Sequence, residues 1–379
     1  MTGSRAPEFA KSEKVLNAYQ TPRTRWSIPP TSAPRRCFPV ERERLLDRRW
    51  IADVGPWRFA VKTLFITGAE GFTGSHLVPY LQGKGYEVVG GVRNRARKLA
   101  FEKTHGRALV CDVSDAINVA RAIASVKPEA VIHLAGEAKP HFANAEPLEA
   151  YQSIVTAWAN VLDGVRRVTP RARVLLVSAC DVYGRTGDDG QLLSEDATLD
   201  PVNTFGSLKA TAESLAHTFY NNYHLNVTIA RPFHFTGAGQ SPEFFYASVA
   251  RRLANWNPGQ DGDTFELPDL GCRRELLHVQ DVVEGLTVLL ESGRPDAVYN
   301  VCSGKALTVR QLCETLVQMA GRSVTLRDLP ADSEHQVRCY CGSGARMEQE
   351  FGWRPTRSTE TALDELLKSF APQPAPVTT

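Results

Sequence analysis

The sequence predicts an α/β fold built on a doubly wound parallel sheet of the Rossmann type. Two observations carry this prediction. From Val61 onward, short apolar segments alternate with segments of helical periodicity, which is typical of a parallel sheet covered by helices on both faces. The first apolar segment, Thr63–Ile66, is followed by a glycine-rich turn and then a helix, the order that a dinucleotide site requires.

The glycine-rich turn carries three glycines that are spaced three residues apart. The first permits a tight turn, the second lets the backbone approach a pyrophosphate, and the third lets the helix pack closely on the strand. The N-terminus of that helix offers free N–H groups and the positive end of its dipole to phosphates. A plain structural turn is the alternative. We predict cofactor contacts at Gly68, Gly71, Phe72, Thr73 and Gly74.

The end of the second predicted strand, which begins at Tyr86, indicates which dinucleotide binds. In an NAD site an acid stands there and binds both ribose hydroxyls. Here Val92 and Arg93 take its place, and Arg95 follows. Because arginine suits a 2′-phosphate, we predict NADP in preference to NAD, with a solvated basic turn as the alternative.

Four further strands are predicted at 109–111, 130–136, 173–177 and 226–230, with long helices over 148–165 and 205–219. His133 lies inside an apolar strand, so we expect it to be packed rather than catalytic. The remaining predicted cofactor contacts follow the third strand, where adenine would lie, or end the fourth, where small residues leave room. They are Asp112, Val113, Leu134, Ala135 and Gly136.

Composition restricts the class of protein. The 379 residues are 42% apolar and 23% charged, as in globular proteins, and the net charge of +2 gives no indication of nucleic-acid binding. No apolar run reaches membrane-spanning length and no secretory signal is visible, so we predict no membrane partner. The eight scattered cysteines predict reduced thiols and a cytoplasmic location. Cys339 and Cys341 are too close for the usual zinc spacing, and no metal is predicted.

Residues 1–60 differ from the rest of the chain. They hold seven Pro and ten Arg, and their two Lys and six acids give a charge of +6. No clear apolar period runs through them. We therefore predict a disordered N-terminal extension.

Several motifs together resemble the extended short-chain dehydrogenase/reductases of the nucleotide-sugar epimerase/dehydratase family. The resemblance runs from about 62 to 369. The segments 239–242 and 300–305 look most like GDP-4-keto-6-deoxy-mannose reductases, with GDP-mannose dehydratases close behind. The motifs are Thr67–Gly74, His133–Gly136, Val182–Gly184, Arg231–Phe233, Gly237–Pro242, Arg274–Val282, Tyr299–Gly304 and Phe351–Pro355.

The resemblance implies a division of the chain. Residues 61–231 with 275–303 would form the NADP-binding Rossmann domain. Residues 232–274 with 304–369 would form a smaller C-terminal lobe that holds a nucleotide-diphosphate sugar, followed by a tail over 370–379. Members of this family often form homodimers through the helices that follow the fourth and fifth strands. Apolar residues on those helices would supply that surface or belong to the core: Trp158, Val165, Leu215 and Phe219.

The catalytic set implied by the resemblance is incomplete. It comprises a Ser or Thr, a Tyr whose hydroxyl transfers the substrate proton, and a Lys four residues later that lowers the Tyr pKa and binds the nicotinamide ribose. Lys209 matches the Lys, but Phe205 stands at the Tyr position and Ala179 at the Ser/Thr position. Losing a positioned general acid typically costs about 10²–10⁴ in rate.

Three other residues are candidates for the substrate site, which Ala179 and Phe205 would also line. Asp181 stands where dehydratases of the family carry a Glu, so it is either a base or a polar turn residue. His234 stands where the family usually has Asn, and would donate a proton near neutral pH or contact the diphosphate. Arg274 resembles the arginine that pairs with the diphosphate, an ion pair with Glu275 or a neighbour being the alternative.

These residues favour an NADP-dependent enzyme that modifies a nucleotide sugar, as a 4-keto-sugar reductase, dehydratase or epimerase does, with altered proton-transfer groups. Lys209, Asp181 and His234 are the predicted catalytic residues. A catalytically silent protein that binds NADP and a nucleotide sugar is the first alternative, because Phe205 and Ala179 replace reactive groups. An enzyme of this fold with a non-sugar substrate is the second.

Overall fold

The computed structural model describes residues 63–257, 262–329 and 337–371. The predicted extension 1–60 lies outside these ranges. The strands are β1 Thr63–Thr67, β2 Glu87–Val92, β3 Ala108–Val110, β4 Ala130–His133, β5 Arg173–Val177, β6 Val227–Pro232, β7 Phe235–Thr236, β8 Thr264–Leu267, β9 Arg273–Arg274, β10 Leu277–His278, β11 Val298–Val301, β12 Leu307–Thr308, β13 Thr325–Asp328 and β14 Cys339–Tyr340.

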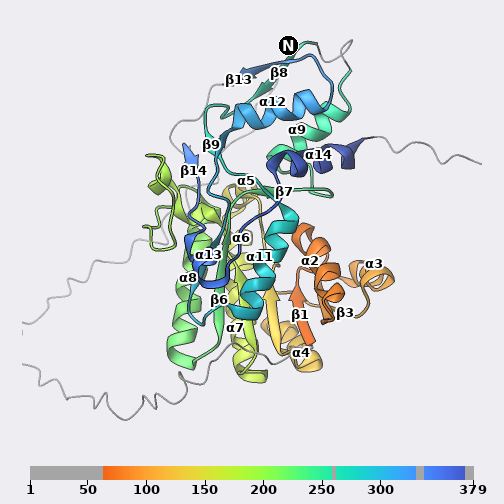
Figure 1. The fold of residues 1–379 in the computed structure, drawn as a ribbon. Helices are drawn as coiled ribbons and strands as arrows, with labels where there is room; N and C mark the ends of the chain where they lie inside the picture. The colour runs from red at the N-terminus through yellow and green to blue at the C-terminus, as the bar shows by residue number, and fades with distance from the viewer. Residues whose placement is uncertain (1–62, 258–261, 330–336, 372–379) are drawn as a thin grey trace, which may run out of the picture. The chain divides into compact units, whose positions relative to one another are not determined.

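The helices alternate with these strands through the first half of the described chain (Figure 1). They are α2 Phe72–Gly83, α3 Arg95–His105, α4 Ala116–Val126, α5 Pro140–Ala145, α6 Pro147–Tyr151, α7 Ala157–Val168, α8 Thr204–Tyr223, α9 Phe245–Ala254, α11 Val279–Ser292, α12 Val309–Met319, α13 Ala345–Phe351 and α14 Thr359–Phe370.

The central sheet confirms the predicted doubly wound fold. Its order is β11-β6-β5-β4-β1-β2-β3, and every pair within it is parallel. The order reverses between β1 and β4, which is the switch point where such sheets bind ligands beyond the carboxyl ends of their strands. All six predicted strands are present. The seventh, β11, falls in a segment that was assigned to the Rossmann domain without a strand being named in it.

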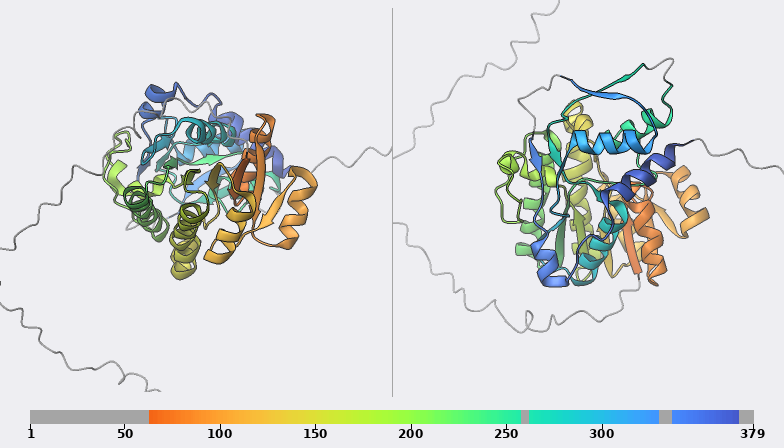
Figure 2. Two further views of the ribbon diagram at one scale, coloured as in Figure 1. Left: turned by 90° about the horizontal axis from the view of Figure 1, so that it is seen from below. Right: turned by 45° about the horizontal axis from the view of Figure 1, so that its top comes forward.

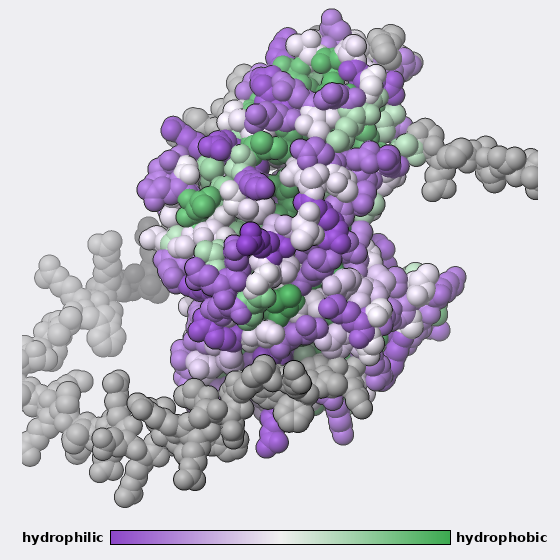
Figure 3. All heavy atoms as spheres, viewed as in Figure 1, coloured by the Kyte–Doolittle hydropathy of each residue, from purple (hydrophilic) through white to green (hydrophobic). Residues whose placement is uncertain are grey.

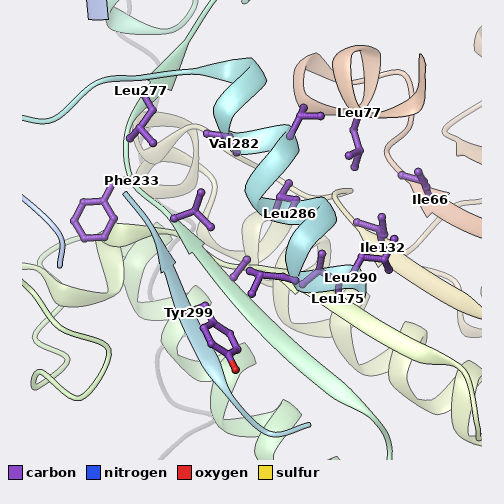
Figure 4. Packing of buried hydrophobic residues seen from close by; sticks show 14 of the residues in the cluster. Ile66, Leu77, Ile132, Leu175, Phe233, Leu277, Val282, Leu286, Leu290 and Tyr299 are labelled. Atoms are coloured by element: carbon purple, nitrogen blue, oxygen red, sulfur yellow. The ribbon is translucent and has the colours of Figure 1, made fainter. Parts of the chain in front are cut away.

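Helices cover both faces of the sheet, as predicted (Figure 2). On one face, α2 and α11 pack together over a core that includes Leu77 and Leu286, and Figure 4 shows these side chains directed at strand residues such as Ile132. On the other face, α4, α7 and α8 enclose a second core around Trp158. Because both faces are covered, the strands are apolar throughout rather than alternating.

Three helices and a strand pair form a smaller group of their own, whereas α13 packs on the core of the central sheet. The helices α9, α12 and α14 pack on the parallel pair β8–β13 around their own apolar core. These elements lie together in Figure 1, and β9, β12 and β14 form a short sheet beside them. In this short sheet, Tyr340 of β14 pairs in register with Arg274 of β9.

The long helix predicted over 148–165 contains a wider, π-helical turn at Gln152–Thr156, between α6 and α7. The inserted turn rotates the preceding residues away from the buried face. Leu148 and Tyr151 are therefore 79% and 47% exposed, although the helical period places them with the core residues. Trp158 and Val165, in contrast, are buried within the chain, as the core alternative predicts.

The face drawn in Figure 3 is mainly hydrophilic, with apolar residues in small separate groups. Within the described ranges, no helix has both the length and the apolar character needed to cross a membrane.

Candidate functional site

The glycine-rich turn lies at the switch point of the sheet, between β1 and α2. Gly68 has φ of +70°, and a Cβ there would stand 2.7 Å from the Ala135 backbone nitrogen. A Cβ on Gly74 would stand 2.4 Å from the Ala69 carbonyl oxygen. Both positions therefore require glycine. The N-cap of α2 is Gly71, which has no side chain to cap the helix, so its first N–H groups remain available to a phosphate.

The glycine-rich turn and the end of β4 lie side by side, and we call them together the glycine cradle. Gly136 has φ of +139°, and a Cβ there would stand 2.8 Å from the Ser153 carbonyl oxygen in the π-helical turn. Beneath the turn, the Thr67 hydroxyl and His133 Nδ1 lie 2.7 Å apart. Burial lowers the pKa of His133 to about 3, so this side chain is a neutral packed histidine. At these glycines a side chain would collide with the neighbouring backbone. Such close packing of turn, strand and helix is what a dinucleotide-binding turn requires.

The two loop residues predicted beside adenine are held by side chains of neighbouring helices. The Asp112 N–H donates to the Asn118 side chain at 3.2 Å, and the Asp112 carboxylate accepts from the Ser114 hydroxyl at 2.7 Å. Asn160 donates to the Val113 carbonyl at 2.9 Å. Their position after β3 agrees with an adenine contact, which stays a prediction.

An acid that the sequence analysis missed lies at the end of β2. The Arg93 N–H donates to Glu70 Oε1 at 3.0 Å, and Glu70 Oε2 is buried without a hydrogen-bond partner among the described residues. The side chains of Arg93 and Arg95 are exposed beside it. Glu70 belongs to the glycine-rich turn, so its approach to β2 depends on the parallel pairing of β1 with β2 and has no signal in the sequence.

Helix α8 places Phe205 and Lys209 one turn apart, as the spacing predicts. Asn203 caps the helix by accepting from the Gly206 N–H at 2.8 Å. The Phe205 ring is buried, and the Lys209 ammonium lies 5.7 Å from its centroid and 5.5 Å from that of Trp158. Lys209 also donates to the Val177 carbonyl at 2.8 Å. Burial lowers the pKa of Lys209 to about 8, so the ammonium is still mainly charged near neutral pH.

A 3₁₀ turn after β5, Cys180–Tyr183, holds Asp181 at the same end of the sheet. Burial raises the pKa of the Asp181 carboxyl, while a hydrogen bond from Asn203 and the charges of Arg274 and Lys209 lower it. An acid with a raised pKa is suited to exchange protons. Ala179 precedes the turn and packs against the core around Phe205. Ser178 is buried, and its hydroxyl has no hydrogen-bond partner in the described ranges.

His234 lies against this turn from the other side. Its Nδ1 is 3.9 Å from the Cys180 sulfur, and its ring centroid is 5.4 Å from that of Tyr340. Burial and the charge of Arg274 lower the pKa of His234 to about 3. The imidazole is therefore neutral near pH 7, which argues against an imidazolium donor, and the predicted contact with the diphosphate stays a prediction.

Arg274 does not pair with Glu275, which was one alternative in the sequence analysis, and its contact with a diphosphate stays a prediction. Its guanidinium donates to the Arg273 and Val337 carbonyls at 2.9 and 2.8 Å and lies 5.1 Å from the Tyr340 ring centroid. Glu275, the proposed ion-pair partner, accepts instead from the N–H groups of Ser303, Gly304 and Gly342 at 2.8–3.0 Å. Glu275 thus ties three chain segments together beneath the site.

The buried Glu275 carboxyl should make the free energy of unfolding depend on pH. Burial raises its pKa to about 7, although its hydrogen bonds oppose the rise. The folded chain then keeps this proton up to about pH 7, whereas an unfolded carboxyl ionises near 4.5. We expect stability to fall as pH rises through this window, by about 3 kcal/mol. Urea unfolding at both ends of the window measures the change. Glu275→Gln should show a smaller change, and an equal one would contradict the assignment.

Tyr183 has a structural role. Its hydroxyl donates to Asn300 Oδ1 at 2.7 Å and accepts from Arg231 at 2.8 Å. Arg231 in turn pairs with both carboxylate oxygens of Glu213. This network lies in the interior and leaves the Tyr183 hydroxyl without a free hydrogen for a substrate.

Within the described ranges, no three His, Cys, Asp or Glu side chains gather as metal ligands would.

Comparison with known proteins places this geometry in a family. Residues 65–366 match the model of the family described as GDP-mannose 4,6 dehydratase. The chain belongs to this family. The GDP-mannose 4,6-dehydratase family is one of extended short-chain dehydrogenase/reductases, which the sequence motifs had indicated.

Two curated relatives illustrate the range of activities around the GDP-mannose 4,6-dehydratase family. A GDP-6-deoxy-D-mannose reductase of Pseudomonas aeruginosa is 30% identical over 308 residues, which cover 81% of this chain and 96% of the reductase. A probable dTDP-glucose 4,6-dehydratase of Sinorhizobium fredii is 26% identical and covers 81% of this chain and 92% of its own length.

Solved structures show the same fold with bound cofactors. The RMD protein of Pseudomonas aeruginosa, complexed with NADPH, is 28% identical, with a TM-score of 0.70 over 82% of this chain and 98% of that one. The dTDP-glucose 4,6-dehydratase DesIV of Streptomyces venezuelae, with NAD and TYD bound, is 27% identical, with a TM-score of 0.72 over 81% and 96%. Both nicotinamide dinucleotides thus occur among similar structures.

Proposed function

We propose that the chain is an NADP-dependent enzyme that modifies a nucleotide-diphosphate sugar, acting as a reductase of a GDP-linked 4-keto sugar. The observation that carries the proposal is the glycine cradle, in which Gly68 and Gly74 have no room for a side chain. The similarity to a GDP-6-deoxy-D-mannose reductase over 96% of that protein supports the substrate class.

The residues of the cradle would hold the cofactor as follows. The free N–H groups of Phe72, Thr73 and Gly74 would bind the pyrophosphate. Lys209 gives one hydrogen to the Val177 carbonyl and keeps two donors for the nicotinamide ribose. A bound reduced nicotinamide supplies a hydride. Asp181, whose pKa is raised by burial, would exchange protons at the substrate, and Arg274 would face the diphosphate.

The preference for NADP rests on Arg93 and Arg95, whose exposed side chains flank the end of β2. The Glu70 carboxylate opposes a 2′-phosphate, but one of its oxygens already accepts the Arg93 N–H. The guanidinium groups of both arginines would then be available to the phosphate. Guanidinium groups pair well with phosphate because their parallel N–H groups match its oxygens.

We expect the full chain to bind NADPH at least about tenfold more tightly than NADH, because one charge-assisted hydrogen-bonded contact contributes that much. Calorimetric titration of both cofactors measures the ratio. Arg93→Ser should weaken NADPH binding and leave NADH binding unchanged, whereas Glu70→Gln should strengthen NADPH binding. Equal affinities for the two cofactors would contradict the NADP assignment.

A catalytically silent binding protein is the second candidate, and the buried Phe205 ring with Ala179 favours it. The double substitution Phe205→Tyr with Ala179→Ser separates the two. Turnover of GDP-4-keto-6-deoxy-mannose by the unmodified chain would exclude a silent protein. Turnover by the double variant alone would establish that the unmodified chain only binds.

The proposal includes a cytoplasmic homodimer. The seven cysteines in the described ranges carry free thiols, which suits a reducing compartment. Leu148 and Tyr151 offer apolar surface on α6, next to the helices that the resemblance implies for the contact. Light scattering of the purified chain measures the mass. A monomer at micromolar concentration would remove the dimer from the proposal.

A further inference from the structure

Tyr340 is a buried phenol on the substrate side of the site. It belongs to β14, pairs in register with Arg274 of β9, and is 4% exposed. Its hydroxyl is buried and has no hydrogen-bond partner in the described ranges. A hydroxyl buried in this way costs free energy unless a partner arrives, so it points to a ligand that completes the bond.

Tyr340 lies close to the 3₁₀ turn that holds Asp181. The His234 ring lies 5.4 Å away, between centroids, and His234 itself contacts Cys180 at 3.9 Å. Burial is the main cause of a raised Tyr340 pKa, and the Asp181 carboxylate nearby raises it further. Tyr340 therefore reaches the same space as Asp181, although 159 positions separate them in the chain.

Two other buried phenols of the chain are already engaged. The Tyr183 hydroxyl donates to Asn300 and accepts from Arg231. The Tyr299 hydroxyl donates to Glu350 at 2.8 Å. The ring at 205 has no hydroxyl, so the proton donor of the related enzymes is missing from α8.

We propose that Tyr340 supplies the substrate proton in place of the phenol missing at Phe205. This inference rests on the proposed reductase function. In a carbonyl reduction for which a bound reduced nicotinamide would supply the hydride to carbon, the carbonyl oxygen takes the proton of the Tyr340 hydroxyl. The C=O double bond becomes a C–O single bond, the phenol O–H bond breaks, and an alcohol O–H bond forms. The phenolate then regains a proton from water, and Asp181 is placed to relay it.

Arg274 supports this role from the face of the ring. Burial keeps the Tyr340 pKa above its usual value, and the fixed positive charge of Arg274, whose guanidinium carbon lies 5.1 Å from the ring centroid, opposes that rise. A nearby cation stabilises the phenolate left after proton transfer. Lys209 would give the same support to a phenol at position 205. Each of the two positions therefore has a cation beside it, Lys209 at 205 and Arg274 at 340.

The test compares Tyr340→Phe with the unmodified full chain, using NADPH and GDP-4-keto-6-deoxy-mannose. We expect kcat to fall by about 10²–10⁴, as for other lost general acids. NADPH affinity should stay the same, and Tm should not fall, because the hydroxyl makes no hydrogen bond to any residue that the structure describes. Tyr183→Phe is the matched control. It removes a buried hydroxyl that is bonded, so it should lower Tm and leave kcat within about threefold.

Phe205→Tyr, added to Tyr340→Phe, should restore at least part of kcat by returning a phenol beside Lys209. A Tyr340→Phe variant with kcat within about threefold of the unmodified chain would overturn the inference and leave the proposed reductase intact. A loss of kcat accompanied by a fall in Tm as large as that of Tyr183→Phe would also overturn it, by indicating a structural role. Absence of turnover in the unmodified chain would overturn both the reductase and the inference.

Discussion

Gly74→Ala is expected to weaken NADPH binding strongly. The new methyl group would stand 2.4 Å from the Ala69 carbonyl oxygen and 2.6 Å from that of Gly68. Both are backbone atoms, so the turn or the helix must move, and the phosphate cradle moves with it. We expect NADPH affinity to fall on the order of 100-fold, which corresponds to about 2.7 kcal/mol. Calorimetric titration measures it.

Gly83→Ala is the matched control in the same helix. A Cβ at Gly83 meets no atom within 4 Å. Alanine in a helix is more favourable than glycine by about 0.8–1 kcal/mol, so this variant should be slightly more stable and bind NADPH normally. If Gly74→Ala bound NADPH as tightly as Gly83→Ala does, the cradle would not be the phosphate site.

Arg231→Ala is expected to cause the largest loss of stability among the substitutions considered. Arg231 donates to both oxygens of Glu213, to the Tyr183 hydroxyl and to the Glu195 carbonyl. The side chains of Arg231 and Glu213 are 5% and 3% exposed. Removing one partner leaves a buried, unpaired carboxylate, which costs about 3–5 kcal/mol. Urea unfolding measures the loss.

An exposed ion pair provides the comparison for Arg231. Lys368 pairs with Asp364 on α14 at 2.6 Å, and its side chain is 73% exposed. Lys368→Ala should cost at most about 0.5 kcal/mol, because water solvates the remaining charge. Equal losses for the two substitutions would show that the Arg231 network contributes no more than a surface pair.

The sequence predicted the sheet well because its signals are local. Each strand from β1 to β6 is a short apolar run, and Gly68 and Gly74 mark the turn by their spacing alone. The i, i+4 spacing of Phe205 and Lys209 likewise survives in α8. These features depend on neighbouring residues, so folding the rest of the chain does not alter them.

The residues missed by the sequence analysis depend on long-range pairing. Glu70 meets Arg93 only because β1 lies beside β2, and Glu275 meets Ser303 and Gly342 only when three loops converge. Tyr340 comes close to the 3₁₀ turn that holds Asp181 through the pairing of β14 with β9. The exposure of Leu148 follows from a single π-helical turn, which disturbs the helical period and has no clear sequence signal.

A single-turnover experiment tests the central claim that this cradle serves a working reductase. The full chain, in excess, is loaded with NADPH and mixed with GDP-4-keto-6-deoxy-mannose, and the reduced nicotinamide absorbance is followed. The account predicts that bound NADPH is oxidised in proportion to added sugar, with the 4-hydroxy sugar as product. Bound NADPH that stays reduced, with the keto sugar recovered unchanged, would contradict the account.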